Sequence, residues 1–292
     1  MNTRDLQYFV ALVKYKNYTQ VAKHFKVSQP TITQSIQRLE REFNTKLIRK
    51  DKVHRDEMVT RSGMMLFENA KVINKKISLM HQEISRANQR QIRFGLPPII
   101  GKMYISKIVQ QTPETVMQRL KIVSVGSHEL LNRLQEGKID IAVLGSNHLI
   151  NQPGIFASLI TTRPYNIIVS DQNPLAKRKA VFFKELANEY FINYDQQYVH
   201  HAALQAYCAY AGINPQMGDY QVPDISWVKE LVRQDLGISL MAKDALQNEP
   251  GIVSIAIKDP LPEKFTISVA TREGYVLTPD EAAFVEELKG IK

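Results

Sequence analysis

The sequence predicts a two-part α+β chain: a small helical head with a β-wing, one long helix, and a larger α/β domain made of two subdomains. Three observations support this prediction. Residues 1–90 hold 18 Lys or Arg and 8 Asp or Glu, a net charge of +10, whereas residues 91–292 hold 20 and 21, a net charge of −1. A regular apolar seam without proline follows Gly63. From Gln91 onward, short β-rich runs alternate with amphipathic segments.

The composition excludes several classes of protein. With 292 residues, 44% hydrophobic and 23% charged, the chain has the proportions of a globular protein that buries a large core. The single cysteine, Cys208, excludes an intramolecular disulfide and a cysteine-based zinc site, and it is typical of a reducing compartment. No stretch approaches the roughly 18 apolar residues that a membrane span needs, and the amphipathic start does not resemble a signal peptide. We therefore expect a cytoplasmic protein.

Three helices are expected in the head, residues 1–62. Residues 4–14 have an apolar face, Thr19 is expected to cap a second short helix, and Ser28 is expected to cap a third. Pro30 lies in the first turn of that third helix, where its missing N–H costs nothing. The apolar residues of the third helix recur at spacings of four, three and four, which predicts one face packed on the first two helices. They are Ile32, Ile36, Leu39 and Phe43.

The opposite face of the third helix is polar and basic. Such a face suits a recognition helix, which reads base edges from the major groove of DNA. Two short extended runs, 46–48 and 58–60, flank a basic turn and predict a β-hairpin wing whose cations reach the DNA backbone or minor groove. The pattern predicts a winged helix-turn-helix. The candidate DNA-binding residues are Gln29, Pro30, Thr31, Thr33, Gln34 and Arg38 on the helix, and Lys50 and Arg55 in the wing.

These residues closely resemble the N-terminus of LysR-type transcriptional regulators. The start Ser28-Gln29-Pro30, followed by Leu39-Glu40, is specific in combination. The other matching residues are Leu6, Tyr8, Phe9, Tyr18, Thr19, Ala22, Phe25, Val27, Thr33, Ile36, Leu47, Val59, Thr60 and Gly63. The chain departs from the family pattern in four places: Asn44 replaces Gly, Ile48 replaces Phe, Lys50 replaces Arg, and Gln34 stands where Arg is frequent. We expect Asn44 to form a left-handed helix cap, and we do not carry over the family's base preferences.

The long helix, residues 63–90, has an apolar residue every 3.5 positions on average. This spacing is typical of a two-stranded helical pair, whereas a helix that packs on a globular core has a broader stripe. The seam consists of Leu66, Ala70, Ile73, Ile77, Met80, Ile84 and Ala87. A dimer reads two half-sites, so the target DNA should have approximate inverted symmetry. The family resemblance implies the same dimerisation helix, and often tetramers.

The α/β domain, residues 91–292, is expected to have a mostly parallel sheet and two subdomains. Subdomain I takes about 91–162 and 270–292, and subdomain II takes about 163–269. The chain should cross between them near 161–164 and 268–271. The expected strands are 92–96, 120–125, 139–144, 165–169, 190–194, 237–241, 252–257 and 265–270, and the expected helices are 102–111, 128–136, 183–189, 199–211, 226–235 and 279–289. The resemblance implies a fold similar to periplasmic binding proteins.

Ligands of such sheets bind beyond the carboxyl ends of strands, near helix N-termini. Ser127 is expected to cap its helix and to donate to a ligand, and His128, His200 and His201 are expected to supply positive charge near neutral pH. These features favour a small carboxylate or another anion. The candidate effector-binding residues are Pro98, Ile99, Ser127, His128, Tyr194, His200 and Ile225. In the family this first loop usually carries Ser or Thr, whereas Pro97 and Pro98 offer no donor.

The sequence therefore predicts a regulator of transcription whose affinity for DNA or whose bending of DNA responds to a small-molecule effector. RNA polymerase is a further partner if the protein is an activator. We expect no enzyme, because the chain lacks the common catalytic motifs and Cys208 lies in an apolar helix. We expect no cofactor, metal or membrane partner. Two alternatives remain: a zinc-dependent regulator that uses His128 with His200 or His201, and an architectural DNA-binding protein that binds no effector.

Overall fold

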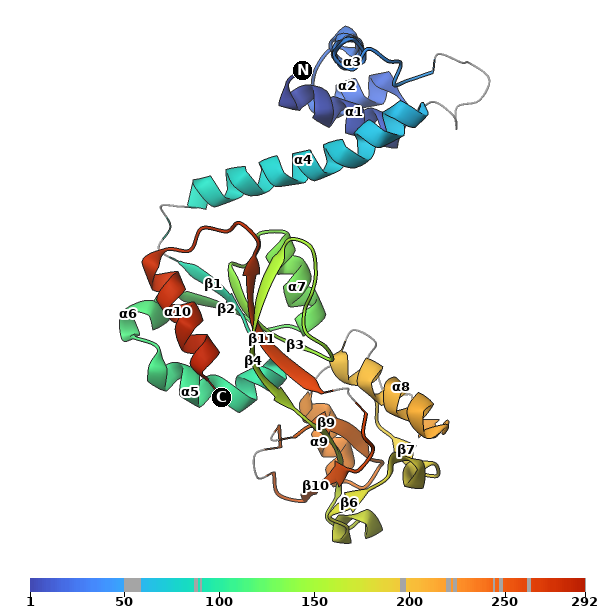
Figure 1. The fold of residues 1–292 in the computed structure, drawn as a ribbon, viewed down its shortest axis with the longest axis vertical. Coiled ribbons are helices and arrows are strands. Elements are labelled where there is room, and N and C mark those ends of the chain that lie inside the picture. The colour runs from blue at the N-terminus through green and yellow to red at the C-terminus, as the bar shows by residue number, and fades with distance from the viewer. Residues whose placement is uncertain are drawn as a thin grey trace. The chain divides into compact units, whose positions relative to one another are not determined.

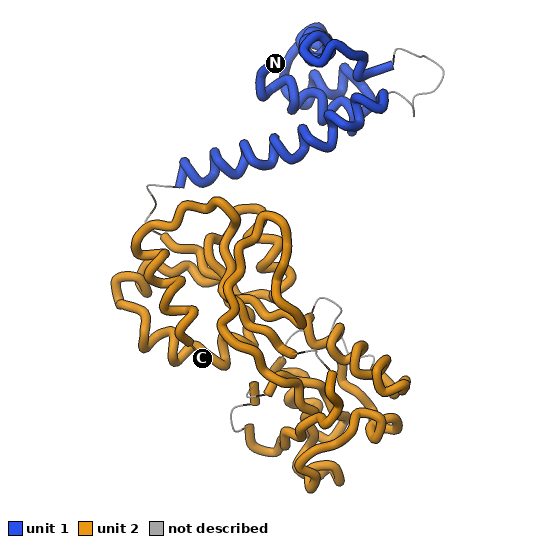
Figure 2. The backbone as a smooth tube through the Cα atoms, viewed as in Figure 1, with its two compact units in different colours: residues 1–88 blue, residues 89–292 orange. Residues whose placement is uncertain are grey.

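The computed structural model describes the chain except for residues 50–58, 87, 88, 90, 195–197, 219–221, 223, 224, 244, 247, 248, 262, 263 and 292. The chain forms two compact units, Met1–Asn88 and Gln89–Lys292, each with its own hydrophobic core (Figure 2). None of the described helices combines the length and apolar character that a membrane crossing requires.

The first unit packs three short helices, α1 (Thr3–Tyr15), α2 (Tyr18–Phe25) and α3 (Gln29–Glu42), around one core (Figure 1). The Ser28 side chain accepts a hydrogen bond from the N–H of Thr31, so the predicted cap of α3 is confirmed. The predicted cap of α2 is wrong. Asn17 caps that helix by accepting from the N–H of Gln20, and Thr19 lies inside it, because the polar side chain that comes first occupies the single N-cap position.

The base of the wing is described, and its tip, residues 50–58, lies outside the described residues. Ile48 and Val59 form an antiparallel bridge, which places the two expected extended runs side by side. Asn44 has the predicted left-handed conformation after α3, with a φ of 47°. Gly63 lies so close to the wing that a Cβ atom there would lie 2.3 Å from the carbonyl oxygen of Leu47, so this position requires glycine.

The long helix α4 spans Arg61–Arg86 and begins two residues before the predicted start. Its apolar seam has two parts. Leu66 and Ala70 pack against the core of the head. Farther along, Ile73, Met80 and Ile84 have exposed fractions of 42%, 47% and 66%. The second half of the seam is therefore an apolar stripe that the head does not cover.

The second unit contains two mixed sheets. The five-stranded sheet has the order β2 (Leu120–Val123), β1 (Ile92–Gly95), β3 (Ile141–Ser146), β11 (Phe265–Arg272) and β4 (Ile155–Arg163). The four-stranded sheet has the order β6 (Ala180–Val181), β10 (Ile252–Ile257), β5 (Tyr165–Ser170) and β9 (Ser239–Ala242). A small parallel pair joins β7 (Tyr190–Phe191) to β8 (Gln216–Met217).

The prediction of a mostly parallel sheet is wrong. β1 is parallel to β2 and β3, but β11 is antiparallel to both β3 and β4, and β5 is antiparallel to both its neighbours. The reason is that β4 and β11 carry the chain between the two sheets in opposite directions. Pro164 separates β4 from β5, at the first predicted crossing. The chain crosses back to the five-stranded sheet between the end of β10 and the start of β11. The predicted second crossing, 268–271, instead falls inside β11.

In the described part of this unit, the helices are α5 (Pro98–Gln111), α6 (Glu114–Met117), α7 (Ser127–Gln135), α8 (Val199–Ala211), α9 (Ile225–Arg233) and α10 (Pro279–Gly290). α5 begins four residues before the prediction because Pro98 fits a first turn. Two 3₁₀ turns span Pro174–Lys177 and Phe183–Leu186, and the second replaces the helix expected at 183–189. The helix α6 and the strands β4, β6 and β8 were not predicted from the sequence.

Alternate residues of the strands face opposite helical layers. On β3, Ile141 and Val143 join the core shared with α5 and α10, whereas Ala142 and Leu144 face α7. On β5, Ile167 faces the core that includes α8, and the next residue along the strand faces α9. Each of the two larger sheets therefore has helices on both faces.

Candidate functional site

The start of α3 exposes the residues that the sequence predicts to contact DNA. Gln29, Pro30 and Gln34 are exposed, and Thr31 and Thr33 are half-buried. Gln29 Nε2 donates to Thr33 Oγ1 at 3.3 Å, and the hydroxyls of Ser28 and Thr31 lie 2.8 Å apart. These contacts align the polar side chains in the first turns of the helix. Lys50 and Arg55 of the wing lie outside the described residues.

Arg38, the last candidate on α3, makes an internal ion pair. Its Nη2 donates to Asp5 Oδ1 at 2.6 Å, and Ser35 Oγ donates to the same oxygen at 2.6 Å. Burial of Asp5 opposes ionisation, but the hydrogen bonds from Arg38 and Ser35 outweigh it and lower the pKa of this carboxyl. Arg38 therefore joins α3 to α1, a role that the sequence analysis missed. The sequence feature that could have indicated this role is Asp5, an acidic residue in the first turn of the amphipathic helix α1.

Glu40 holds the base of the wing against α3. Its Oε1 accepts from the N–H groups of Leu47 and Ile48 at 3.0 and 3.4 Å, and its Oε2 accepts from Lys46 Nζ at 2.8 Å. Burial opposes ionisation of Glu40, and these hydrogen bonds lower its pKa. A hollow of about 550 Å³ between α3 and the wing is lined by Thr33, Gln37 and Arg49, among others. Glu40 thus sets the position of the wing relative to the recognition helix.

The second unit contains a cavity of about 340 Å³ at the starts of four helices. Pro98 and Ile99 of α5, Gly126 and Ser127 at α7, Tyr198 to His200 at α8, and Ile225 of α9 line it, together with Tyr194, Phe265 and others. The starts of α5, α7 and α8 have no side-chain cap hydrogen bond. The cavity brings together six of the seven residues that the sequence predicts to bind an effector. His128 is exposed and does not line it.

Ser127 does not cap its helix, contrary to the prediction. Gly126 is the N-cap residue of α7, and Ser127 is the first residue of the helix. The Ser127 Oγ accepts a hydrogen bond from the N–H of Gly145 on β3 at 2.9 Å. The hydroxyl therefore anchors α7 to the sheet and retains its proton for another acceptor in the cavity.

The prediction that His200 supplies positive charge is also wrong. Burial lowers the pKa of His200 to about 4, so its imidazole is neutral near pH 7. The ring packs among Tyr194, Phe265 and Tyr165, at centroid distances of 4.9, 5.3 and 5.6 Å. Sequence patterns could not reveal this environment, because the three aromatic residues come from distant segments. Cys208, farther along α8, is buried as expected, and burial raises the pKa of its thiol.

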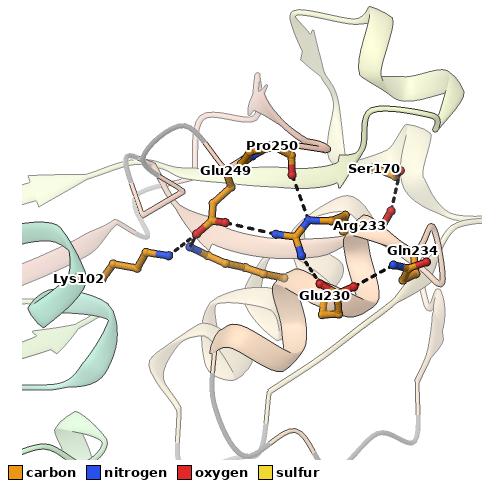
Figure 3. Close-up of polar contacts among 8 residues, drawn as sticks. Lys102, Ser170, Glu230, Arg233, Gln234, Glu249 and Pro250 are labelled. Atoms are coloured by element: carbon orange, nitrogen blue, oxygen red, sulfur yellow. Dashed lines mark hydrogen bonds and ion pairs between the residues drawn. The ribbon is translucent and has the colours of Figure 1, made fainter.

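A network of charged residues joins α5 to α9 (Figure 3). Lys102 of α5 donates to Glu249, which also accepts from Lys229 Nζ at 2.8 Å and from Arg233 Nη2 at 3.3 Å. Burial lowers the pKa of Lys229 to about 8, and hydrogen bonds from Lys102 and Lys229 lower the pKa of Glu249 to about 2. This network was not predicted from the sequence, because its members lie up to 147 positions apart in the chain.

Comparison with known proteins finds a matching family for each of the two units. Residues 3–63 match the family described as "Bacterial regulatory helix-turn-helix protein, lysR family", and residues 85–290 match "LysR substrate binding domain". The chain is 34% identical to the "Malolactic fermentation system transcriptional activator" of Lactococcus lactis subsp. lactis (strain IL1403), an alignment that covers 100% of this chain and 99% of the relative. It is 24% identical to the "DNA-binding transcriptional dual regulator OxyR" of Escherichia coli (strain K12), over 94% of this chain and 90% of that protein.

Solved structures have the same fold. Full-length BenM has a TM-score of 0.58 at 21% identity, with 100% of this chain and 96% of that chain covered. The effector binding domain of QuiR, in complex with shikimate, has a TM-score of 0.60 at 20% identity and covers 68% of this chain and 94% of its own. The chain therefore belongs to the LysR family of transcription regulators, which are not enzymes, and pairs the family's helix-turn-helix with its substrate-binding domain.

Proposed function

We propose that this regulator acts in the cytoplasm as a homodimer on an approximately inverted-repeat DNA site, and that a small carboxylate effector in the 340 Å³ cavity controls it. The observation that supports this most strongly is the convergence of helix starts on the cavity, because α5, α7 and α8 lack side-chain caps there. Unpaired backbone N–H groups and the positive ends of helix dipoles favour a bound anion.

The polar groups of the cavity support the same class of ligand. The Ser127 hydroxyl can donate to a carboxylate oxygen. Glu129 also lines the cavity, but its carboxylate is bound to Arg133, with an Oε1 to Nε distance of 2.9 Å. Two related proteins support carboxylic acids: the QuiR domain is solved with shikimate, and the 34% identical relative is named for a malolactic fermentation system.

A matched pair of variants tests the effector site in the full chain. Ser127→Asp places a negative charge in the cavity, whereas His128→Asp places the same charge on the exposed neighbour that does not line it. Calorimetry with a panel of carboxylic acids, amines and neutral sugars should show carboxylate binding that is lost in Ser127→Asp and kept in His128→Asp. Binding of amines or sugars alone would contradict the proposal.

The DNA-binding candidates are proposed to act in two ways. Gln29, Thr31, Thr33 and Gln34 read base edges, and Lys50 and Arg55 bind phosphates. Gel shifts with DNA selected from a random pool should show relaxed selectivity for Gln29→Ala and Thr33→Ala. Lys50→Ala or Arg55→Ala should weaken all sites alike and reduce the salt dependence of binding.

Effector and DNA are proposed to be coupled through a population shift. The effector favours one arrangement of the two sheets, and this changes the spacing of the paired heads on DNA. Effector affinity should then depend on bound DNA by the same factor as the converse. If the effector changes neither DNA affinity nor DNA bending, the coupling is wrong. Tetramer formation and contact with RNA polymerase are the further partnerships that this function implies for an activator.

A further inference from the structure

Two adjacent histidines at the start of α8 have opposite environments. The His201 Nδ1 lies 2.9 Å from Asn193 Nδ2 and 3.1 Å from the carbonyl oxygen of Tyr194. His200 is 4% exposed and lines the cavity, and its Nε2 atom is buried with no hydrogen-bond partner among the residues that the structure describes. A buried polar atom without a partner destabilises a protein, so a group that pairs with this nitrogen from the cavity would stabilise the fold.

The chemistry of His200 differs from that of the helix starts around it. Its imidazole is neutral near pH 7, so it offers one N–H donor and one nitrogen acceptor but no charge. The wall beside it is aromatic, with Tyr194 and Phe265 packed on the ring. The starts of α7 and α8 can hold a negative charge, whereas His200 can form one uncharged hydrogen bond.

A second carboxylate does not suit the place next to His200. Among the described residues that line the cavity, the only charged side chain is that of the acid Glu129, so none of them offers a positive charge. A carboxylate buried against the aromatic wall would therefore lack a counter-charge, and burying an unpaired charge is very costly. Burying a hydroxyl or oxo group costs much less free energy, and such a group can form a hydrogen bond with a neutral imidazole. Because Nε2 is sealed from water and has no partner among the described residues, the nitrogen gives up no solvent hydrogen bond when it pairs with a ligand in the cavity.

We propose that His200 determines effector specificity by hydrogen-bonding a hydroxyl or oxo group of the ligand, so that the cavity selects hydroxy- or oxo-acids over plain carboxylic acids. This inference rests on the proposed function, because the acid group is bound by the same cavity. This hydrogen bond also gives the unpaired His200 nitrogen a partner. The gain adds to the affinity of hydroxy- and oxo-acids and not to that of plain carboxylic acids.

The test uses the full chain and pairs of acids that differ by one hydroxyl: acetate and glycolate, propanoate and lactate, succinate and malate. In the wild-type protein, the hydroxylated member of at least one pair should bind about 10-fold tighter or more. His200→Phe removes the unpaired nitrogen from an aromatic cluster. It should therefore raise the Tm of the ligand-free protein by about 2–6 °C and abolish the preference. His201→Phe is the matched control and should keep the preference.

A second variant covers the case in which phenylalanine disturbs the cluster. His200→Gln retains a donor and an acceptor, and it should keep part of the preference that His200→Phe loses. Equal binding of the two members of every pair, or a preference that survives His200→Phe, would overturn the role of His200 while the carboxylate class stands. Failure of every acid to bind the wild-type protein would overturn the proposed effector class together with this inference.

Discussion

The guanidinium of Arg38 on α3 is bound to the buried carboxylate of Asp5 on α1, with an Nη2 to Oδ1 distance of 2.6 Å. The Asp5 side chain has no exposed surface, whereas that of Arg38 is 40% exposed. The recognition helix is therefore fixed to the first helix of the head by an ion pair whose acidic member lies in the core. The position of the residues proposed to read base edges, one and two turns earlier on α3, depends on this contact.

Removing Arg38 should destabilise the head strongly. Arg38→Ala leaves the Asp5 carboxylate buried with Ser35 as its remaining side-chain partner, and we expect a loss of about 2–4 kcal/mol in the free energy of unfolding. Arg41→Ala is the control, because Arg41 is exposed on α3 and its Nε donates to the Gln37 carbonyl of the same helix. Hydrogen exchange of peptides from residues 3–42, measured by mass spectrometry, reports the local free energy. Equal exchange in the two variants would show that Arg38 does not stabilise the head.

The head should also lose stability in acid. The Asp5 pKa is lower in the folded protein than in the unfolded chain, because the hydrogen bonds from Arg38 and Ser35 outweigh the effect of burial. Its contribution is therefore complete above the ordinary aspartate pKa of about 4 and disappears as the pH falls through the lower folded value. Exchange of the same peptides between pH 6 and pH 2.5 should show a smaller loss in Asp5→Asn, while Glu42→Gln, on the exposed end of α3, should behave like the wild type.

The network around Glu249 predicts a non-additive pair of substitutions. Glu249→Gln leaves the buried Lys229 ammonium with the Ala245 carbonyl as its remaining acceptor among the described residues, and we expect a loss of about 2–4 kcal/mol in the free energy of unfolding. Adding Lys229→Met should restore most of this loss, because the unpaired charge is gone. Glu230→Gln, which affects an exposed carboxylate paired with Arg233, should change stability by less than about 1 kcal/mol. Urea unfolding of the second unit measures all three, and additive losses would contradict this account.

The features that the sequence predicted correctly are those set by neighbours in the chain. Ser28 and Pro30 define the start of α3 locally. The short apolar helix α8 ends where Gly212 forms its left-handed C-cap. The errors arise where the outcome depends on distant residues. The direction of β11 depends on its pairing with β3 and β4, and the charge of His200 depends on Tyr165 and Phe265. Six of the seven residues predicted to bind an effector line the cavity, and they could be found because helix starts that follow strands gather at one end of a sheet.

The exposed half of the α4 seam predicts a dimer that a single charge should separate. Ile84 is 66% exposed on the seam, and a glutamate there would place two like charges in the contact between paired helices. Ile84→Glu should therefore weaken self-association by at least about 10-fold and reduce binding to an inverted-repeat DNA while leaving the fold of the head intact. Val72→Glu is the matched control: Val72 is 68% exposed but lies one position outside the seam. Sedimentation equilibrium of both variants measures the association. If Ile84→Glu remains as dimeric as Val72→Glu, the seam does not form the dimer contact, and the pairing of the heads must come from another surface.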